Sequence, residues 1–426
     1  MKQRSPFLSA PVIAALLFQA PAFVCAQQGL TWDQVKAKFE AGNPALRADA
    51  DNVDEMRAEE ITAYLRPNPQ FTGTVDGTQI APEHGVWQPL AGTFVSPGVS
   101  YLHERDRKRE LRLESAREGT RISESEHEDL KRTLELTLRT AFVDTLEAKT
   151  VLEMAKADLE YYDKIIDISR DRLKAGDIAQ IDFDRIELLR VQYESEIQST
   201  IVNLRTAKIQ LLTLLNDRTP VDQFDVDGPF DFSDTLQPLD DLRRTALDAR
   251  PDLQAALETI QQSQANYKLA KANGSTDPTF SAWYTWNAST NNPNADQTLG
   301  LSASIPLRIF DRNQGEKKRT QIDIERSQQA SEATRAQVFS DVDSAYAEVE
   351  SNIALLKPYK AKYTDEALRV RDTVTYSYQH GGASLMDFLN AQSDYRQVQL
   401  AYAQLVGAYL TAVGQLNYAV GREVIP

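Results

Sequence analysis

One unbroken helical pattern, at about 107–175, limits the possible folds of this chain more than any other feature. Apolar or small side chains recur in alternating steps of four and three residues, a period of 3.5 that is typical of coiled coils. No proline interrupts the stretch, which at 1.5 Å per residue extends on the order of 100 Å. A compact domain cannot hold such a rod. The seam residues are Leu134, Leu138, Ala141, Thr145, Ala148, Leu152, Ala155, Leu159, Tyr162, Ile166, Ser169 and Leu173.

A second stretch repeats this pattern later in the chain. Lys360 is the one charged residue of this second seam. Pro358 predicts a kink in the helix, because proline lacks the backbone N–H group and clashes with the preceding turn. The seam residues are Val342, Tyr346, Val349, Ile353, Leu356, Lys360, Tyr363, Ala367, Val370 and Val374.

Both rods belong to a tandem repeat. The turn at Gly381 follows the turn at Gly176 by 205 residues, and at that offset Asp387 matches Asp182. Each half begins with a helix (about 31–63 and 239–272), continues through two extended segments, and ends in a helical hairpin. A period this long indicates a duplicated domain rather than a short-repeat solenoid. The predicted divisions are a first repeat at 27–216 with its hairpin at about 107–215, a linker at 217–238, and a second repeat at 239–426 with its hairpin at about 312–420.

Four extended segments are expected, at about 69–77, 92–102, 279–287 and 297–306. Each has the length of a membrane-crossing β-strand. Phe71, Gly73 and Val75 alternate with threonines, and Trp283, Tyr284 and Trp286 suit an aromatic girdle at a membrane interface. Open strand edges are not tolerated in lipid, so several copies of the chain must share one barrel.

Residues 1–26 have the layout of a secretory signal peptide, with a basic start, an apolar stretch and a small residue at the cleavage position. The alternative is a lipoprotein acylated at Cys25, the only cysteine. Cleavage of this segment would remove Lys2 and Arg4, leaving 45 of the 47 Lys and Arg residues. With 62 acidic residues, the mature chain would have a net charge of −17. That charge repels nucleic acid and favours cations.

No catalytic site or cofactor motif emerges from the sequence. The four histidines lie scattered, without the paired spacing of metal ligands, and no phosphate-binding loop has its required strand–glycine–helix order. We therefore expect neither an enzyme nor a resident metal or cofactor.

Signal peptide, tandem repeat, strand pairs and long hairpins together resemble the TolC-like outer-membrane efflux family over nearly the whole mature chain. The segments "IPLRIFDRNQGEKKR", "AGDIA" and "GGASLMDFLNAQ" look like its heavy-metal, CzcC-like branch. The resemblance implies a mainly α fold with a small β part. Three copies would form a periplasmic α-barrel and a twelve-stranded transmembrane β-barrel. It also implies an adaptor protein, an inner-membrane pump of the RND type and outer-membrane lipid as partners.

The resemblance also implies roles for the two turns. The periplasmic tip and adaptor contact would comprise Arg172, Leu173, Gly176, Tyr378, Gly381 and Ser384. Asp182 and Asp387 either cap the returning helices or narrow the pore as a ring of carboxylates, and both roles can hold together. Ala383 and Asn390 depart from some drug-exporting relatives, which carry an arginine and an aspartate there, so a gate built from those charges would be different here.

The sequence therefore favours a passive outer-membrane exit duct of a tripartite efflux system for small solutes, including metal cations. One alternative is the outer-membrane duct of a type I protein secretion system. Another is a secreted coiled-coil structural protein with no pore.

Overall fold

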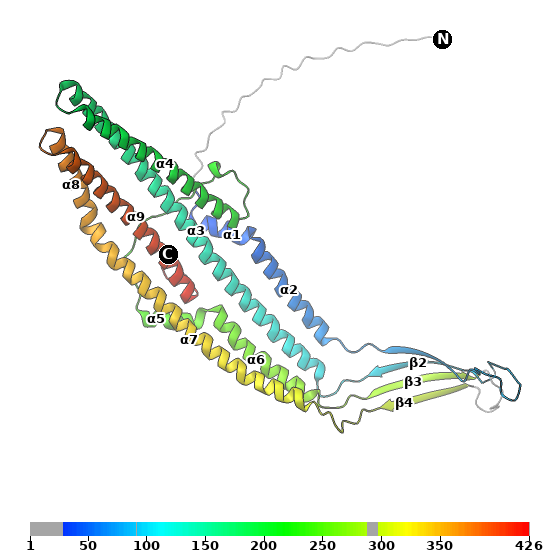
Figure 1. Ribbon diagram of the computed structural model, residues 1–426. Coiled ribbons are helices and arrows are strands. Elements are labelled where there is room, and N and C mark those ends of the chain that lie inside the picture. Colours follow the sequence, from blue (N-terminus) through cyan, green and yellow to red (C-terminus); the bar gives the residue numbers. More distant parts are fainter. Residues whose placement is uncertain (1–28, 91, 288–296, 426) are drawn as a thin grey trace, which may run out of the picture.

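The computed structural model describes residues 29–90, 92–287 and 297–425. The predicted signal peptide at 1–26 lies outside these residues. Figure 1 shows a long helical body with a narrow sheet projecting from one end and two helical turns at the other end. This mainly helical fold with a small β part confirms the predicted fold class. None of the described helices is both long and apolar enough to cross a membrane.

The same order of elements occurs twice. The first half contains α1 (Trp32–Gly42), α2 (Pro44–Tyr64), β1 (Gln70–Asp76), β2 (Phe94–Leu102), α3 (Lys108–Ala175) and α4 (Gln180–Leu214). The second half contains α5 (Leu239–Ala249), α6 (Pro251–Ala272), β3 (Thr279–Asn287), β4 (Gln297–Ser304), α7 (Gln314–Pro358), a π-helical turn (Tyr359–Tyr363), α8 (Thr364–Gln379) and α9 (Leu385–Val420). A short 3₁₀ turn, Val221–Gln223, lies in the connecting segment.

Each half opens with two helices where the sequence suggested one. Asn43 caps α2 by accepting hydrogen bonds from the N–H groups of Ala45 (2.9 Å) and Leu46 (3.2 Å), and Pro44 begins that helix. Pro251 breaks the second pair at the equivalent place. The expectation of single helices was wrong because a residue before proline is disfavoured in the α conformation.

The long helix α3 has 68 residues, a rod of about 100 Å. Each of its twelve predicted seam residues is buried or half-buried. In the second half the predicted seam residues from Val342 to Leu356 are buried or half-buried. Beyond Leu356 the predicted seam is no longer buried: Tyr363 is 45% exposed and Val370 is 52% exposed. The π-helical turn after Pro358 inserts one extra residue, so burial passes to the next positions along, including Thr375. The chain also changes direction there (Figure 1).

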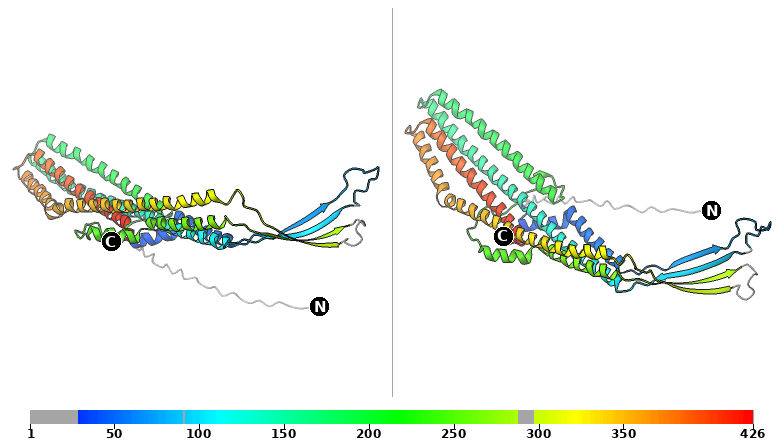
Figure 2. Two further views of the ribbon diagram at one scale, coloured as in Figure 1. Left: turned by 90° about the horizontal axis from the view of Figure 1, so that it is seen from below. Right: turned by 60° about the horizontal axis from the view of Figure 1, so that its bottom comes forward.

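The four described strands form one antiparallel sheet in the order β1-β2-β3-β4. The views in Figure 2 show it as a curved ribbon that extends from the end of the helical body at an angle to it. β2 and β3 are hydrogen-bonded neighbours, so the two repeats meet in the middle of the sheet and leave β1 and β4 as its edges.

Candidate functional site at the helical tip

Two glycine turns lie at the end of the helical body away from the sheet (Figure 1). Gly176 (φ 82°) and Gly381 (φ 77°) both adopt the left-handed conformation that side chains with a Cβ rarely take. The Asp177 N–H donates to the carbonyl of Arg172 (2.9 Å), and the Gly382 N–H donates to that of Ser377 (2.7 Å). Each turn therefore closes its long helix with the hydrogen bonds of a Schellman motif.

Ser384 and Asp387 form a capping box at the start of α9. The Ser384 Oγ accepts from the Asp387 N–H (3.1 Å), and the Asp387 carboxylate accepts from the Ser384 N–H (3.1 Å) and hydroxyl (2.7 Å). These hydrogen bonds lower the pKa of the exposed Asp387 carboxyl. Asp182 occupies the first turn of α4, but its cap residue Ala179 has no side-chain hydrogen bond. The hydrogen-bonded cap is thus present at Asp387, whereas Asp182 favours the positive end of α4 through its charge alone.

Tyr378 joins the two hairpins. The Arg172 Nη1 donates to the Tyr378 carbonyl (2.8 Å), and the guanidinium lies 5.1 Å from the centre of the Tyr378 ring. That ring is 5% exposed and stacks on Phe388 at 5.0 Å. Burial raises the pKa of Tyr378. The Tyr378 hydroxyl is buried and has no hydrogen-bond partner among the described residues. The nearby Ser169 hydroxyl opposes the rise in the Tyr378 pKa, but the two hydroxyls do not form a hydrogen bond.

An apolar cluster, here called the tip cluster, surrounds this contact. Tyr162 stacks on Tyr193 at 4.6 Å, and its hydroxyl donates to the carbonyl of Ile186 (3.0 Å). Leu173 packs against the cluster from its edge. The sequence analysis missed this packing because it treated each hairpin separately. The buried members are Tyr162, Ile165, Ile166, Phe183, Ile186, Tyr193, Tyr378 and Phe388.

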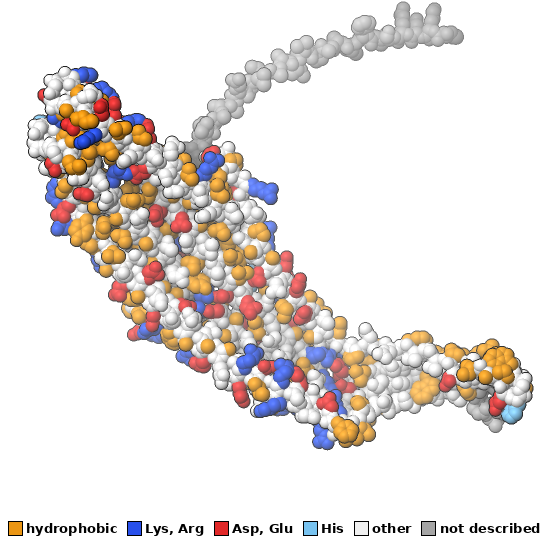
Figure 3. All heavy atoms as spheres, in the orientation of Figure 1, with side chains coloured by type: hydrophobic (Ala, Val, Ile, Leu, Met, Phe, Trp, Pro, Cys, Tyr) orange, Lys and Arg blue, Asp and Glu red, His pale blue; other side chains and the backbone are white. Residues whose placement is uncertain are grey.

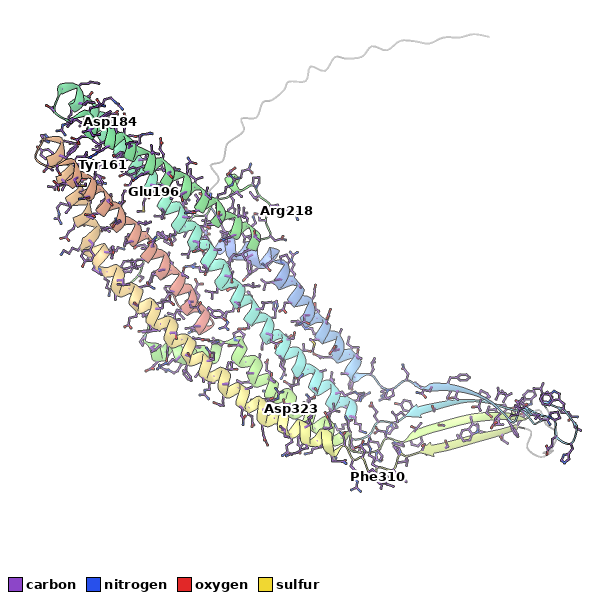
Figure 4. All side chains as sticks on the ribbon, viewed as in Figure 1. Tyr161, Asp184, Glu196, Arg218, Phe310 and Asp323 are labelled. Atoms are coloured by element: carbon purple, nitrogen blue, oxygen red, sulfur yellow. The ribbon has the colours of Figure 1, made fainter. Side chains whose placement is uncertain are left out.

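A charged layer lies next to the tip cluster, where Figure 4 labels Tyr161 and Glu196. Arg396 of α9 pairs with Glu196 of α4 and lies 3.8 Å from the carboxylate of Asp158 on α3. Its guanidinium also lies over the Tyr193 ring at 4.5 Å. Burial raises the pKa of Asp158 to about 6; Glu196 adds to this shift, whereas Arg396 opposes it. No sequence pattern indicated this layer, because its members come from separate helices.

The sheet has one apolar and one polar face. Residues paired across antiparallel strands point to the same face, so the register assigns each side chain. The apolar face carries Phe71, Val75, Val95, Val99, Phe280, Ala282, Tyr284, Trp286, Leu299 and Leu301. The polar face carries Thr72, Thr74, Ser96, Ser100, Ser281, Thr285, Thr298 and Ser302. Figure 3 shows few charged side chains on the strand region.

Trp283 does not share a face with the other two predicted interface aromatics. It pairs with Gly98 and Gly300 on the polar face, whereas Tyr284 and Trp286 lie on the apolar face. A Cβ at Gly300 would come within 2.2 Å of the indole, so the ring lies against the glycine backbone. The predicted grouping of Trp283 with Tyr284 and Trp286 was therefore wrong, because consecutive strand residues alternate between faces.

Comparison with known proteins agrees with this architecture. Residues 242–422 match the family described as "Outer membrane efflux protein". The chain is 24% identical over 307 residues to outer membrane protein TolC of Escherichia coli K12, covering 68% of this chain but only 61% of TolC, less than two thirds of its length. It is 20% identical over 408 residues to the cobalt-zinc-cadmium resistance protein CzcC of Cupriavidus metallidurans, covering 92% and 93% of the two chains. A solved structure of CusC superposes with a TM-score of 0.77 at 18% identity, covering 98% of this chain and 99% of CusC.

The solved structures share the fold of this chain, a long helical body that continues into a small antiparallel sheet. These matches confirm the predicted resemblance to the TolC-like outer membrane efflux family and to its CzcC-like branch. The family consists of passive channels, which confirms that the protein is not an enzyme. It lies in the outer membrane with a large periplasmic extension, as predicted.

Proposed function

We propose that this chain is the homotrimeric exit duct of a tripartite efflux system, built from repeats at 27–216 and 239–426. One observation carries the proposal: the two ends of a single helical rod have different chemistry. One end bears a sheet with one apolar face, and the other end bears two glycine turns held together by Arg172 and Tyr378.

The trimer is supported by surfaces that one chain leaves without a partner. Within residues 29–90, 92–287 and 297–425, the strands β1 and β4 have no neighbour along their outer edges, and open edges are not tolerated in lipid. An apolar stripe also follows α4 at intervals of seven residues or their multiples: Ile181 (60% exposed), Leu188 (69%), Val202 (61%) and Ile209 (46%). Such a heptad stripe needs a facing helix. Three copies would close a twelve-stranded barrel and continue the helices as an α-barrel.

The two sheet faces set the orientation of the barrel wall. We place the apolar face, with Tyr284 and Trp286, against outer-membrane lipid and the polar face, with Trp283, toward the lumen. Phe310, 88% exposed, lies where the sheet meets the helical body (Figure 4). Aromatic girdles flank the apolar band of outer-membrane barrels, so this junction fits the periplasmic boundary of the membrane.

The tip is the proposed gate and adaptor contact. The hydrogen bond from Arg172 to Tyr378 holds the hairpins together, and an adaptor that binds around Leu173, Gly176, Gly381 and Ser384 would separate them. Energy would come from an inner-membrane pump of the RND type, because the family is passive. Opening by separation of packed elements is a common form of switching.

We propose small solutes, including metal cations, as cargo. The exposed Asp387 has a lowered pKa and so stays ionised at neutral pH. Three copies of it, with Asp182 nearby, would narrow the pore with negative charge, which favours cations. The relative CzcC is a cobalt-zinc-cadmium resistance protein. Replacing Asp387 with Asn should lower the cation selectivity of trimers in planar bilayers; unchanged selectivity would remove Asp387 from the constriction.

The gate is tested by Gly176→Val and Gly381→Val in cells that express the neighbouring adaptor and pump genes. A β-branched residue at φ near +80° is strained by at least about 1–2 kcal/mol, so both variants should lose metal efflux while heat-modifiable trimers remain. Gly315→Val is the matched control, since Gly315 has open space and no positive φ. Wild-type efflux by both tip variants would refute the gate. Neighbouring genes for a polypeptide transporter would favour the type I secretion alternative.

A further inference from the structure

A cleft of about 570 Å³ separates two apolar cores in the middle of the helical body. Phe142 and Leu146 on one side belong to the core of α1, α3 and α4. Tyr409 and Val413 on the other side belong to the core of α5, α7 and α9. Protein interiors are close-packed, with few voids larger than a water molecule. Apolar surface left open on this scale has the size of a small-molecule site.

The connecting segment and the chain end complete the cleft walls. Gly228 packs closely on Phe142, since a Cβ there would lie 3.4 Å from the ring. The Tyr409 hydroxyl donates to the Ser233 carbonyl (3.1 Å), which fixes the segment over the cleft. On the opposite side, Asn417 accepts hydrogen bonds from the Val424 N–H (2.9 Å) and Ile425 N–H (3.1 Å) and so pins the chain end. The walls are thus held in place before any ligand arrives.

The rim of the cleft is mainly acidic. The carboxylates of Asp33, Asp227 and Glu423 are exposed there, and none lies within 4.0 Å of a basic nitrogen of the described residues. A fourth, Asp231, is neutralised by Lys360. Among the described rim residues the one basic group is Arg139, which lies over the Trp32 ring at 4.7 Å and whose charge interacts with Glu423 and Asp33. The three carboxylates outnumber this guanidinium, so the rim is net negative and complements an apolar molecule with one positive charge.

We infer that this cleft binds an amphiphilic cation, an apolar body bearing one ammonium or similar group, at a site separate from the proposed duct. The apolar body fills the space between Phe142 and Val413, and the positive group lies near Asp227. The inference does not rest on the efflux function, because the site is built within one chain from both repeats.

The test uses the full-length protein in lipid nanodiscs, which avoids competition from detergent, and measures fluorescence anisotropy of rhodamine 6G, an amphiphilic cation. We expect saturable micromolar binding and at least about fivefold weaker binding of the anionic amphiphile anilinonaphthalene sulfonate. Gly228→Leu should weaken rhodamine binding roughly tenfold by filling the cleft. Gly315→Leu, at a glycine with open space outside the cleft, should leave it unchanged.

Asp227→Asn is an independent test in case Gly228→Leu fails to fold. Asp227 is exposed, so its replacement should not disturb folding. It should weaken rhodamine binding about two- to fivefold and strengthen the binding of the anionic probe. The inference is overturned if rhodamine 6G does not bind in the micromolar range, or if both probes bind equally. Unchanged rhodamine affinity in a folded Gly228→Leu variant, or in Asp227→Asn, overturns it as well.

Discussion

Asp158 should make the contact between the two hairpins dependent on pH. Its side chain is 17% exposed, and burial raises its pKa from 3.8 to about 6. A folded-state pKa above the unfolded value means that the carboxyl's contribution to stability is fully present below about pH 3.8 and is lost as the pH rises through about 6. The difference corresponds to about 3 kcal/mol at pH 7.5, which the remaining solvent access reduces to roughly 2 kcal/mol.

The variant Asp158→Asn removes the charge and keeps the shape. It should be more stable than the wild type by roughly 2 kcal/mol at pH 7.5 and by less than about 1 kcal/mol at pH 4.5, where the folded wild type already carries the proton. Urea denaturation of the protein in detergent, followed by tryptophan fluorescence, measures both values. Glu153→Gln, at an exposed carboxylate on the same helix, should change neither. An equal effect of Asp158→Asn at the two pH values would refute the reasoning.

Three further predictions concern the tip, the sheet and the π-helical turn. Tyr378→Phe removes a buried hydroxyl that has no hydrogen-bond partner in the part of the chain that the structure describes, and it should raise the stability of the tip by about 1 kcal/mol in the same urea assay. A loss of stability would show that this hydroxyl forms a hydrogen bond in solution. Leu301→Arg on the apolar face should destabilise the membrane-inserted trimer by about 2–4 kcal/mol and so reduce its amount on semi-native gels. Ser302→Arg on the polar face should not reduce it, and equal effects of the two variants would contradict the assigned faces. Pro358→Ala should let the regular helix continue and slow hydrogen exchange across the π-helical turn, and unchanged exchange would show that proline does not cause the turn.

The elements that follow from local chemistry could be predicted from the sequence. The period of 3.5 in α3 specifies a long buried seam whatever its partner, and each of its twelve positions is buried or half-buried. Glycine at 176 and 381 supplies the left-handed conformation at both turns, and Ser384 with Asp387 forms a local capping box. Each of these interactions joins residues a few positions apart, so their spacing carries the necessary information.

Other features needed the tertiary structure. Beyond Leu356, the side of the helix that is buried depends on one extra residue in a π-helical turn. The presence of Pro358 in the sequence predicts a kink but does not specify that extra residue. Which face of the sheet carries Trp283 was likewise decided by strand pairing, which places Trp283 opposite Gly98 and Gly300. Neither the phase nor the choice of face could be inferred from residue types, because both are set by neighbouring elements.

By itself, the sequence determined the rods, the turns, the repeat and the family, because these depend on periodicity and on residues close together in the chain. Only the tertiary structure decided how the hairpins meet. Arg172 reaches the carbonyl of Tyr378 and Arg396 reaches Glu196 across about two hundred positions of sequence. Such contacts leave no periodic trace, because they arise only when the packing of the helices brings distant residues together.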